Sequence, residues 1–182
     1  ARHKNNSIAA IKILKHPKGG SLKRFISEIT ILNQIRDIPG VLPIIDSLSL
    51  RQVGTAEHVW FTMPVAVPIL ESIKDENSTP QLLQGIARIA ETLTILHGQD
   101  ITHRDIKPEN ILLWKDHWVI SDFGIASFPN KEALTVANRK LGPLYYIAPE
   151  MLDRADRADA TKADVYSLAK TLWVLLTGQT FP

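Results

Sequence analysis

The chain has 182 residues, 45% of them apolar, and a formal net charge of +2. This length fits one domain with its own hydrophobic core, and the small net charge argues against a nucleic-acid-binding surface. The absence of cysteine excludes disulfides, thiolate metal sites and thiol nucleophiles. The first seven residues lack the apolar core of a signal peptide, and the most apolar run, residues 59–70, is too short to span a bilayer. These features predict a cytoplasmic protein without a membrane segment.

The N-terminal third predicts strands around one helix. Residues 8–14 are largely apolar and are followed by turn-forming residues, which favours a strand. Apolar side chains recur at helical spacing over residues 22–35, and Pro39–Gly40 ends this helix. Two further strands are predicted over residues 41–50 and 59–63, joined by a polar turn.

The middle of the chain predicts a connector, a long helix and a hairpin. Residues 64–78 have no clear period and are interpreted as a connector with a short helix. Residues 81–97 form a strongly amphipathic helix, with glycine beyond its end. Residues 111–114 and 118–121 are predicted to pair as a hairpin. Residues 125–149 show little periodicity, and long segments of this kind within a compact domain are usually functional.

The last predicted element is a helix over residues 163–176, which is so apolar that we expect it to be buried nearly all round. Strands with one helix come first and helices follow, which predicts an α+β chain. We expect two parts, residues 1–66 and residues 67–182.

Two short motifs carry most of the chemical information. Residues 103–110 read His-Arg-Asp-Ile-Lys-Pro-Glu-Asn, and Asp122-Phe123-Gly124 follows the predicted hairpin. They bring two acidic groups, a lysine and an asparagine onto loops at fixed offsets, as a site for Mg²⁺, a phosphate chain and a hydroxyl nucleophile requires. The pair of motifs resembles the catalytic and metal-binding segments of the eukaryotic-type protein kinases, and most closely those of the Ser/Thr branch.

The resemblance implies a role for each polar residue of these motifs. Asp105 is the expected catalytic base for the substrate hydroxyl, and Lys107 is expected to neutralise the transferring γ-phosphoryl group. Asn110 and Asp122 would supply hard oxygen ligands for Mg²⁺. His103 and Phe123 would stack with Leu32 as a structural column. The expected activity is ATP- and Mg²⁺-dependent transfer of phosphate to Ser/Thr hydroxyls of protein substrates.

A lysine on the first strand is the expected phosphate anchor. Ala10-Ile11-Lys12 resembles the family strand whose lysine holds the α- and β-phosphates and is itself held by a carboxylate. Glu28 is the only acidic residue between Lys12 and Asp37, and it lies within the predicted helix. We therefore expect Lys12 and Glu28 to form an ion pair.

The resemblance also places the adenine pocket. Met63 falls at the position beside the adenine ring. The carbonyl of Pro64 and the N–H of Ala66 could form hydrogen bonds with the edge of adenine. Adenine sites are chiefly apolar, so Ala10 and Leu112 fit above and below the ring.

The segment around residues 142–150 resembles the family's activation-segment end but departs from it at one position. Pro143 stands where a threonine is usual, and proline has no hydroxyl to bridge the catalytic residues. The Ser/Thr assignment therefore rests on Lys107–Pro108. Thr135 is the predicted activating phosphorylation site, with Arg104 as its cationic partner. Asp164 matches the family aspartate that braces the catalytic loop.

The resemblance covers the chain, but the chain lacks parts that the family has. No glycine-rich hairpin precedes Lys12, and the family continues with more helices after residue 182. The prediction is thus a two-lobed α+β protein-kinase-like fold, incomplete at both ends. Two alternatives remain open: a catalytically impaired binding module, and a small-molecule kinase of the aminoglycoside or choline type. The sequence does not indicate an oligomeric state.

Overall fold

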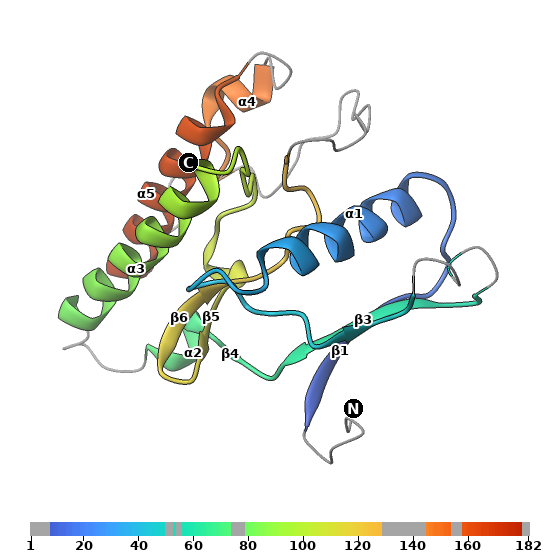
Figure 1. The fold of residues 1–182 in the computed structure, drawn as a ribbon. Helices are drawn as coiled ribbons and strands as arrows, with labels where there is room; N and C mark the ends of the chain where they lie inside the picture. Colours follow the sequence, from blue (N-terminus) through green and yellow to red (C-terminus); the bar gives the residue numbers. More distant parts are fainter. Residues whose placement is uncertain are drawn as a thin grey trace.

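The computed structural model describes residues 8–49, 53, 56–73, 79–128, 145–153 and 158–179. The β1–β3–α1 region lies on one side, α3 and α5 lie side by side on the other, and a hairpin lies between them (Figure 1). Helices and strands are mixed, and the strand pairs within both sheets are antiparallel, so the predicted α+β class is confirmed. In chain order the elements are β1 (Ala9–Leu14), α1 (Gly19–Ile35), β2 (Asp46–Ser47), β3 (Val59–Pro64), β4 (Val67–Pro68), α2 (Ile69–Ser72), α3 (Thr79–His97), the 3₁₀ helix η1 (Pro108–Asn110), β5 (Ile111–Trp114), β6 (His117–Ile120), α4 (Pro149–Asp153) and α5 (Ala160–Thr177).

The first sheet has the strand order β1–β3–β2, and α1 packs against it. The rings of Phe25 on α1 and Phe61 on β3 lie with their centroids 5.4 Å apart. Lys12 is paired with Phe61 in the β1–β3 register, so the face of β1 that carries Lys12 looks toward α1. Helix α1 begins at Gly19, three residues before its predicted start, and presents its apolar side to the sheet.

The predicted strand over residues 41–50 is wrong for most of its length. Among its described residues, 41–49, only Asp46 and Ser47 pair with β3 in the sheet. Pro43 cannot donate a ladder hydrogen bond, and the residues before it bond elsewhere. The N–H of Leu42 donates to the carbonyl of Ile120 at 2.9 Å, and the N–H of Ile120 donates to the carbonyl of Gly40 at 2.7 Å. This segment therefore ties the α1 region to β6.

The second sheet has the order β4–β5–β6 and contains the predicted hairpin. Its turn is the two residues Lys115 and Asp116, with φ values of 49° and 61°. Two successive positive φ values match the right-handed twist of the paired strands. The second strand therefore begins and ends one residue earlier than predicted, and its last residue, Ile120, is fully buried.

Helix α5 packs along α3, which lies beside it in Figure 1. The Asp159 carboxylate caps its first turn, and Gly178 ends it in the left-handed conformation. The prediction that this helix is buried nearly all round is wrong for the described residues. Val165, Trp173 and Leu176 are 59%, 45% and 47% exposed. The other described elements cover only the face of α5 that carries Ala163, Asp164, Ser167, Leu168 and Thr171.

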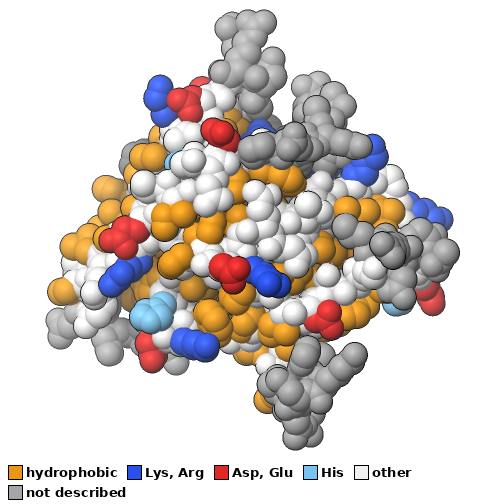
Figure 2. Space-filling view, viewed as in Figure 1, with side chains coloured by type: hydrophobic (Ala, Val, Ile, Leu, Met, Phe, Trp, Pro, Cys, Tyr) orange, Lys and Arg blue, Asp and Glu red, His pale blue; other side chains and the backbone are white. Residues whose placement is uncertain are grey.

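One buried apolar cluster runs from α1 through β3 and β6 to α3 and α5. Within the described part of the chain, none of the helices is both long and apolar enough to cross a bilayer. On the face shown in Figure 2, charged side chains of both signs are scattered among exposed hydrophobic ones.

Candidate active site

The loop after α3 gathers three of the predicted site residues around one carboxylate. Lys107 Nζ lies 2.8 Å from Asp105 Oδ2. Asn110 Nδ2 donates both to the carbonyl oxygen of Asp105 at 2.8 Å and to its Oδ2 at 2.9 Å. The helix η1 makes this possible because its single turn brings Asn110 back toward Asp105. The Asp105 carboxylate is thereby held in one orientation by two neighbouring donors.

His103 is part of the scaffold of this loop. Its ring meets Phe123 edge-on, with centroids 4.6 Å apart. Its Nε2 donates to the carbonyl of Ser121 at 3.1 Å, and its Nδ1 accepts from the N–H of Asp105 at 3.2 Å. Burial lowers the pKa of His103, which favours the neutral imidazole that these two bonds require. The predicted stacking of His103 on Phe123 is confirmed, and Leu32 belongs to the same buried cluster as Phe123.

A buried carboxylate on α5 accepts hydrogen bonds from the backbone of the loop that carries Asp105. Asp164 is fully buried and accepts from the N–H groups of His103 at 2.8 Å and Arg104 at 2.7 Å. The expectation that Asp164 braces the catalytic loop is confirmed. These bonds support Arg104 in a left-handed conformation, φ = 68°, which is strained for a residue with a side chain.

Sequence reasoning missed the third donor to this carboxylate. His97 Nε2 lies 2.9 Å from Asp164 Oδ2. His97 is the last residue of α3, and a histidine at a helix end is a weak signal, because it also fits a solvated cap. Only the packing of α3 on α5 brings the two side chains together.

Lys12 joins the first sheet to α1 and to the loop after β6. Its Nζ lies 2.6 Å from Glu28 Oε1 and 3.0 Å from Asp122 Oδ1. The predicted Lys12–Glu28 ion pair is therefore confirmed. The second contact, to Asp122, does not follow from the sequence pattern, although both residues belong to the predicted site.

The burial of this cluster changes how its carboxylates titrate. Burial raises the pKa of Glu28 to about 7, although the Lys12 ammonium acts in the opposite direction. Burial also acts to raise the pKa of Asp122, but the charge of Lys12 and its hydrogen bond outweigh it and hold that pKa below its usual value. Asp122 therefore carries the more stable negative charge of the two.

The donor set fits a magnesium ion. Asn110 turns its Nδ2 toward Asp105, which leaves its Oδ1 available as a ligand. Asp122 adopts φ = 63°, and the N–H of Gly124 donates to its Oδ1 at 3.3 Å. Across the described residues, no group of three or more His, Cys, Asp or Glu side chains could hold a metal alone. An ion at Asn110 and Asp122 would thus complete its shell with phosphate oxygens and water, as Mg²⁺ commonly does.

The residues predicted to surround adenine lie along the connection between the two sheets. Ala10 pairs with Met63 in the β1–β3 register, and Pro64 is the last residue of β3. Leu112 pairs with Pro68, two residues beyond Ala66. All five predicted residues are partly exposed, as the wall of an open pocket requires. Their contact with adenine stays a prediction.

Two expectations fall outside the described residues. Thr135 and Pro143 both lie within residues 129–144. The proposed partner of Thr135, Arg104, is described, and its Nε is buried with no hydrogen-bond partner in the described part of the chain. The phosphorylation of Thr135 therefore stays a prediction.

Comparison with known proteins points to the same chemistry. The family model for the protein kinase domain matches residues 1–182. The chain is 36% identical over 126 residues to human receptor-interacting serine/threonine-protein kinase 1. The matched region covers 61% of this chain and 19% of that protein. It is 42% identical over 101 residues to serine/threonine-protein kinase PknE of Mycobacterium tuberculosis (54% and 17% covered). It is 30% identical over 173 residues to serine/threonine-protein kinase grp of Drosophila melanogaster (93% and 32% covered). The chain thus spans between 17% and 32% of the length of these relatives.

Proposed function

This chain belongs to the protein kinase family, and we propose that it transfers the γ-phosphate of ATP to serine or threonine hydroxyls of protein substrates. The observation that carries the proposal is the presence of two sets of polar contacts, one around Asp105 and one around Lys12. Lys107 and Asn110 hold Asp105, while Lys12 links Glu28 to Asp122. The Lys107–Pro108 pair and the names of the relatives support serine or threonine, rather than tyrosine, as the acceptor residue.

Asp105 is the proposed base. Its carboxylate orients the substrate hydroxyl and accepts its proton as the oxygen attacks the γ-phosphorus. Lys107, 2.8 Å from this carboxylate, lies close enough to neutralise charge that develops on the transferring group. Mg²⁺, when bound by Asn110 and Asp122, would offset the charge of the nucleotide phosphates.

Lys12 is the proposed anchor for the α- and β-phosphates. Glu28 fixes the direction of the ammonium, so the lysine is oriented before nucleotide binds. Ala10, Met63, Pro64, Ala66 and Leu112 are the proposed adenine contacts. We further propose that residues 1–66 and residues 67–182 act as two lobes that enclose the nucleotide between them.

Lys12→Met tests the proposal on the 182-residue chain. Nucleotide affinity, measured by calorimetry with ATP and Mg²⁺, and phosphoryl transfer to a serine-containing protein substrate are followed separately. We expect Lys12→Met to weaken nucleotide binding and to abolish transfer. Lys15→Met, three residues along, removes an exposed lysine and is the matched control. If Lys12→Met binds and turns over nucleotide like the parent chain, the assignment is wrong; if the parent chain binds nucleotide without any transfer, the chain is a binding module.

A further inference from the structure

A large cavity lies away from all the residues assigned to the reaction. It has a volume of about 1060 Å³ and is bounded by the segment after α1, by one side of α3 and by the β5–β6 hairpin. Its lining does not include Lys12, Glu28, Asp105, Asn110 or Asp122. Neighbouring residues of a strand point to opposite faces. Leu113 lines this cavity, whereas Leu112 beside it is a proposed adenine contact.

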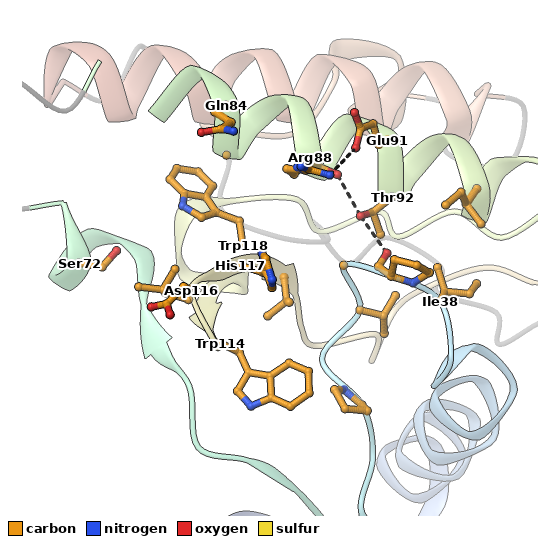
Figure 3. A pocket seen from close by; sticks show the side chains of 18 of the residues that line it. Ile38, Ser72, Gln84, Arg88, Glu91, Thr92, Trp114, Asp116, His117 and Trp118 are labelled. Atoms are coloured by element: carbon orange, nitrogen blue, oxygen red, sulfur yellow. Dashed lines mark hydrogen bonds and ion pairs between the residues drawn. The ribbon is translucent and has the colours of Figure 1, made fainter. Parts of the chain in front are cut away.

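The cavity has an aromatic wall. Two of the four tryptophans of the chain, Trp114 and Trp118, line it. Trp118 packs so tightly on α3 that its ring atoms would lie 2.2 Å from a Cβ at Gly85. Trp114 is contacted by the Lys115 ammonium, 4.5 Å from its ring centroid. In Figure 3, Trp118 lies beside Gln84 of α3, and Trp114 lies farther from that helix. A ring already held by its neighbours, as Trp118 is, loses little freedom on binding.

The charges around the cavity argue against an anionic ligand. Arg36 pairs with Asp37 at 3.8 Å, and Arg88 pairs with Glu91 at 3.6 Å. Among the described residues of the lining, Asp116 is the remaining charged one; it is negative and lies on the hairpin turn. Gln81, Gln84 and Ser72 add uncharged hydrogen-bonding groups. Aromatic walls with a few polar groups at this volume are typical of small-molecule sites.

The cavity is bordered by the segments that connect to two parts of the candidate site. Helix α1, which carries Glu28, runs directly into residues 36–41 of the cavity lining, and β6 ends two residues before Asp122. The backbone bonds between Gly40, Leu42 and Ile120 join these segments. Thr92 Oγ1 on α3 shares its one proton between the carbonyl of Arg88 at 3.0 Å and the carbonyl of Pro39 at 3.2 Å (Figure 3). The second contact ties the segment after α1 to α3.

We propose that this cavity is a regulatory site for an uncharged, planar aromatic small molecule. A ligand bound between the segment after α1 and the β5–β6 hairpin would favour one position of α1 relative to β6 over others. That shift would change the contacts of Lys12 with Glu28 and Asp122. The regulatory consequence rests on the proposed function, whereas the ligand site itself does not.

The binding test uses 6-fluoroquinoline, a neutral bicyclic probe, with the 182-residue chain and fluorine NMR. We expect saturable binding with a dissociation constant of about 1 mM, typical of a ligand of this size. Trp114→Ala, which removes one wall, and Gln84→Trp, which fills the cavity from an exposed helix position, should each weaken binding by about tenfold. Trp173→Ala, on α5, is the matched control and should bind as the parent chain does. Circular dichroism checks that each variant is folded.

Absence of saturable binding would overturn the site, as would binding that both cavity variants leave unchanged. The coupling is read from the amide resonance of Gly124, whose N–H donates to Asp122 Oδ1. This signal should shift with the same midpoint as the fluorine signal, while the amide of Gly178, bonded to Val174, should not. If the Gly124 amide resonance does not shift while the probe is bound, the proposed coupling is wrong. Neither readout needs nucleotide, so a failure of the proposed kinase activity is distinguished from a failure of this site.

Discussion

Glu28 is nearly removed from water, with 4% of its side chain exposed, and this makes its protonation sensitive to folding. The pKa of Glu28 is about 7 in the folded chain against an ordinary value of 4.5. The folded state therefore binds more protons at this residue than the unfolded state does between these values. The contribution of Glu28 to stability is fully present below pH 4.5 and is lost as the pH rises through about 7.

Glu28→Gln should remove this pH dependence. At 1.36 kcal/mol per pKa unit, the difference between 4.5 and about 7 corresponds to about 3 kcal/mol. We expect the free energy of unfolding of the variant, relative to the parent chain, to rise by up to that amount between pH 5 and pH 8. Urea unfolding across this range measures it. The lowered pKa of His103 acts in the opposite direction, but it is common to both proteins and cancels. Parallel pH profiles would contradict the prediction.

Asp105→Asn and Asp122→Asn should impair the reaction at different steps. Asp105 is held by Lys107 and Asn110 and is the proposed base, so its amide variant should bind ATP and Mg²⁺ but lose most phosphoryl transfer, roughly 10²-fold or more. Asp122 is a proposed metal ligand, so its variant should lose the Mg²⁺-dependent part of nucleotide binding. Calorimetry with and without Mg²⁺, together with a transfer assay, separates the two. Full turnover by both variants would show that the site is assigned incorrectly.

At the scale of elements, close backbone approach decides how α3 is placed. Gly85 faces Trp118 of β6, and a Cβ there would lie 2.2 Å from the indole ring. Gly40, with φ = 82°, leaves no room for a Cβ beside Thr92. Glycine at these two positions lets α3 lie directly against the hairpin and the segment after α1, so that Thr92 can bond the carbonyl of Pro39.

Gly85→Ala should therefore destabilise the chain. The added methyl group forces the indole of Trp118 to move, which typically costs about 1–3 kcal/mol. Gly20→Ala is the matched control, because Gly20 also lies in a helix but a Cβ added there would meet no atom within 4 Å. That change should be neutral or stabilising by up to about 1 kcal/mol. Thermal unfolding of both variants measures the difference, and equal melting temperatures would contradict the packing argument.

At the scale of the whole molecule, apolar side chains remain at the surface of two elements. Ile11 and Ile13 are exposed on β1, and Val165, Trp173 and Leu176 are exposed on α5. On the face shown in Figure 2, hydrophobic side chains lie at the surface among separate charges of both signs and other polar groups. Exposed apolar groups of this extent favour association in water.

We expect the 182-residue chain to self-associate. Light scattering after gel filtration should give a mass above the 20.3 kDa of one chain. Val165→Glu combined with Leu176→Lys adds charge to the exposed side of α5 and should shift the mass toward that value. Ala90→Glu on α3 adds charge to an exposed helix position outside these apolar groups and serves as the control. A parent chain that remains monomeric at high concentration would refute the expectation.

Elements with strong local signals were predicted well. The amphipathic period defined α1 and α3 to within three residues of each end, and two short runs flanking a polar stretch identified the hairpin. The prediction of a strand over residues 41–50 was wrong for most of its length. An apolar segment can pair in a sheet or connect two elements, and periodicity does not distinguish the two cases. The exposed side of α5 was wrong because composition reports how apolar a helix is, not which neighbours cover it.

The amino-acid sequence by itself determined the family and the identity of the polar residues. The spacing of residues within 103–110 and 122–124 is a local property of the chain, so it can be recognised without knowledge of any tertiary contact. It also singled out Glu28 as the partner of Lys12 by leaving no other acid nearby. Only the tertiary structure decided that Lys12 contacts Asp122 as well, that His97 reaches Asp164, and that two tryptophans line a cavity. Each of these depends on how separate elements pack, and packing is set by side-chain volume and close backbone approach between residues far apart in the chain.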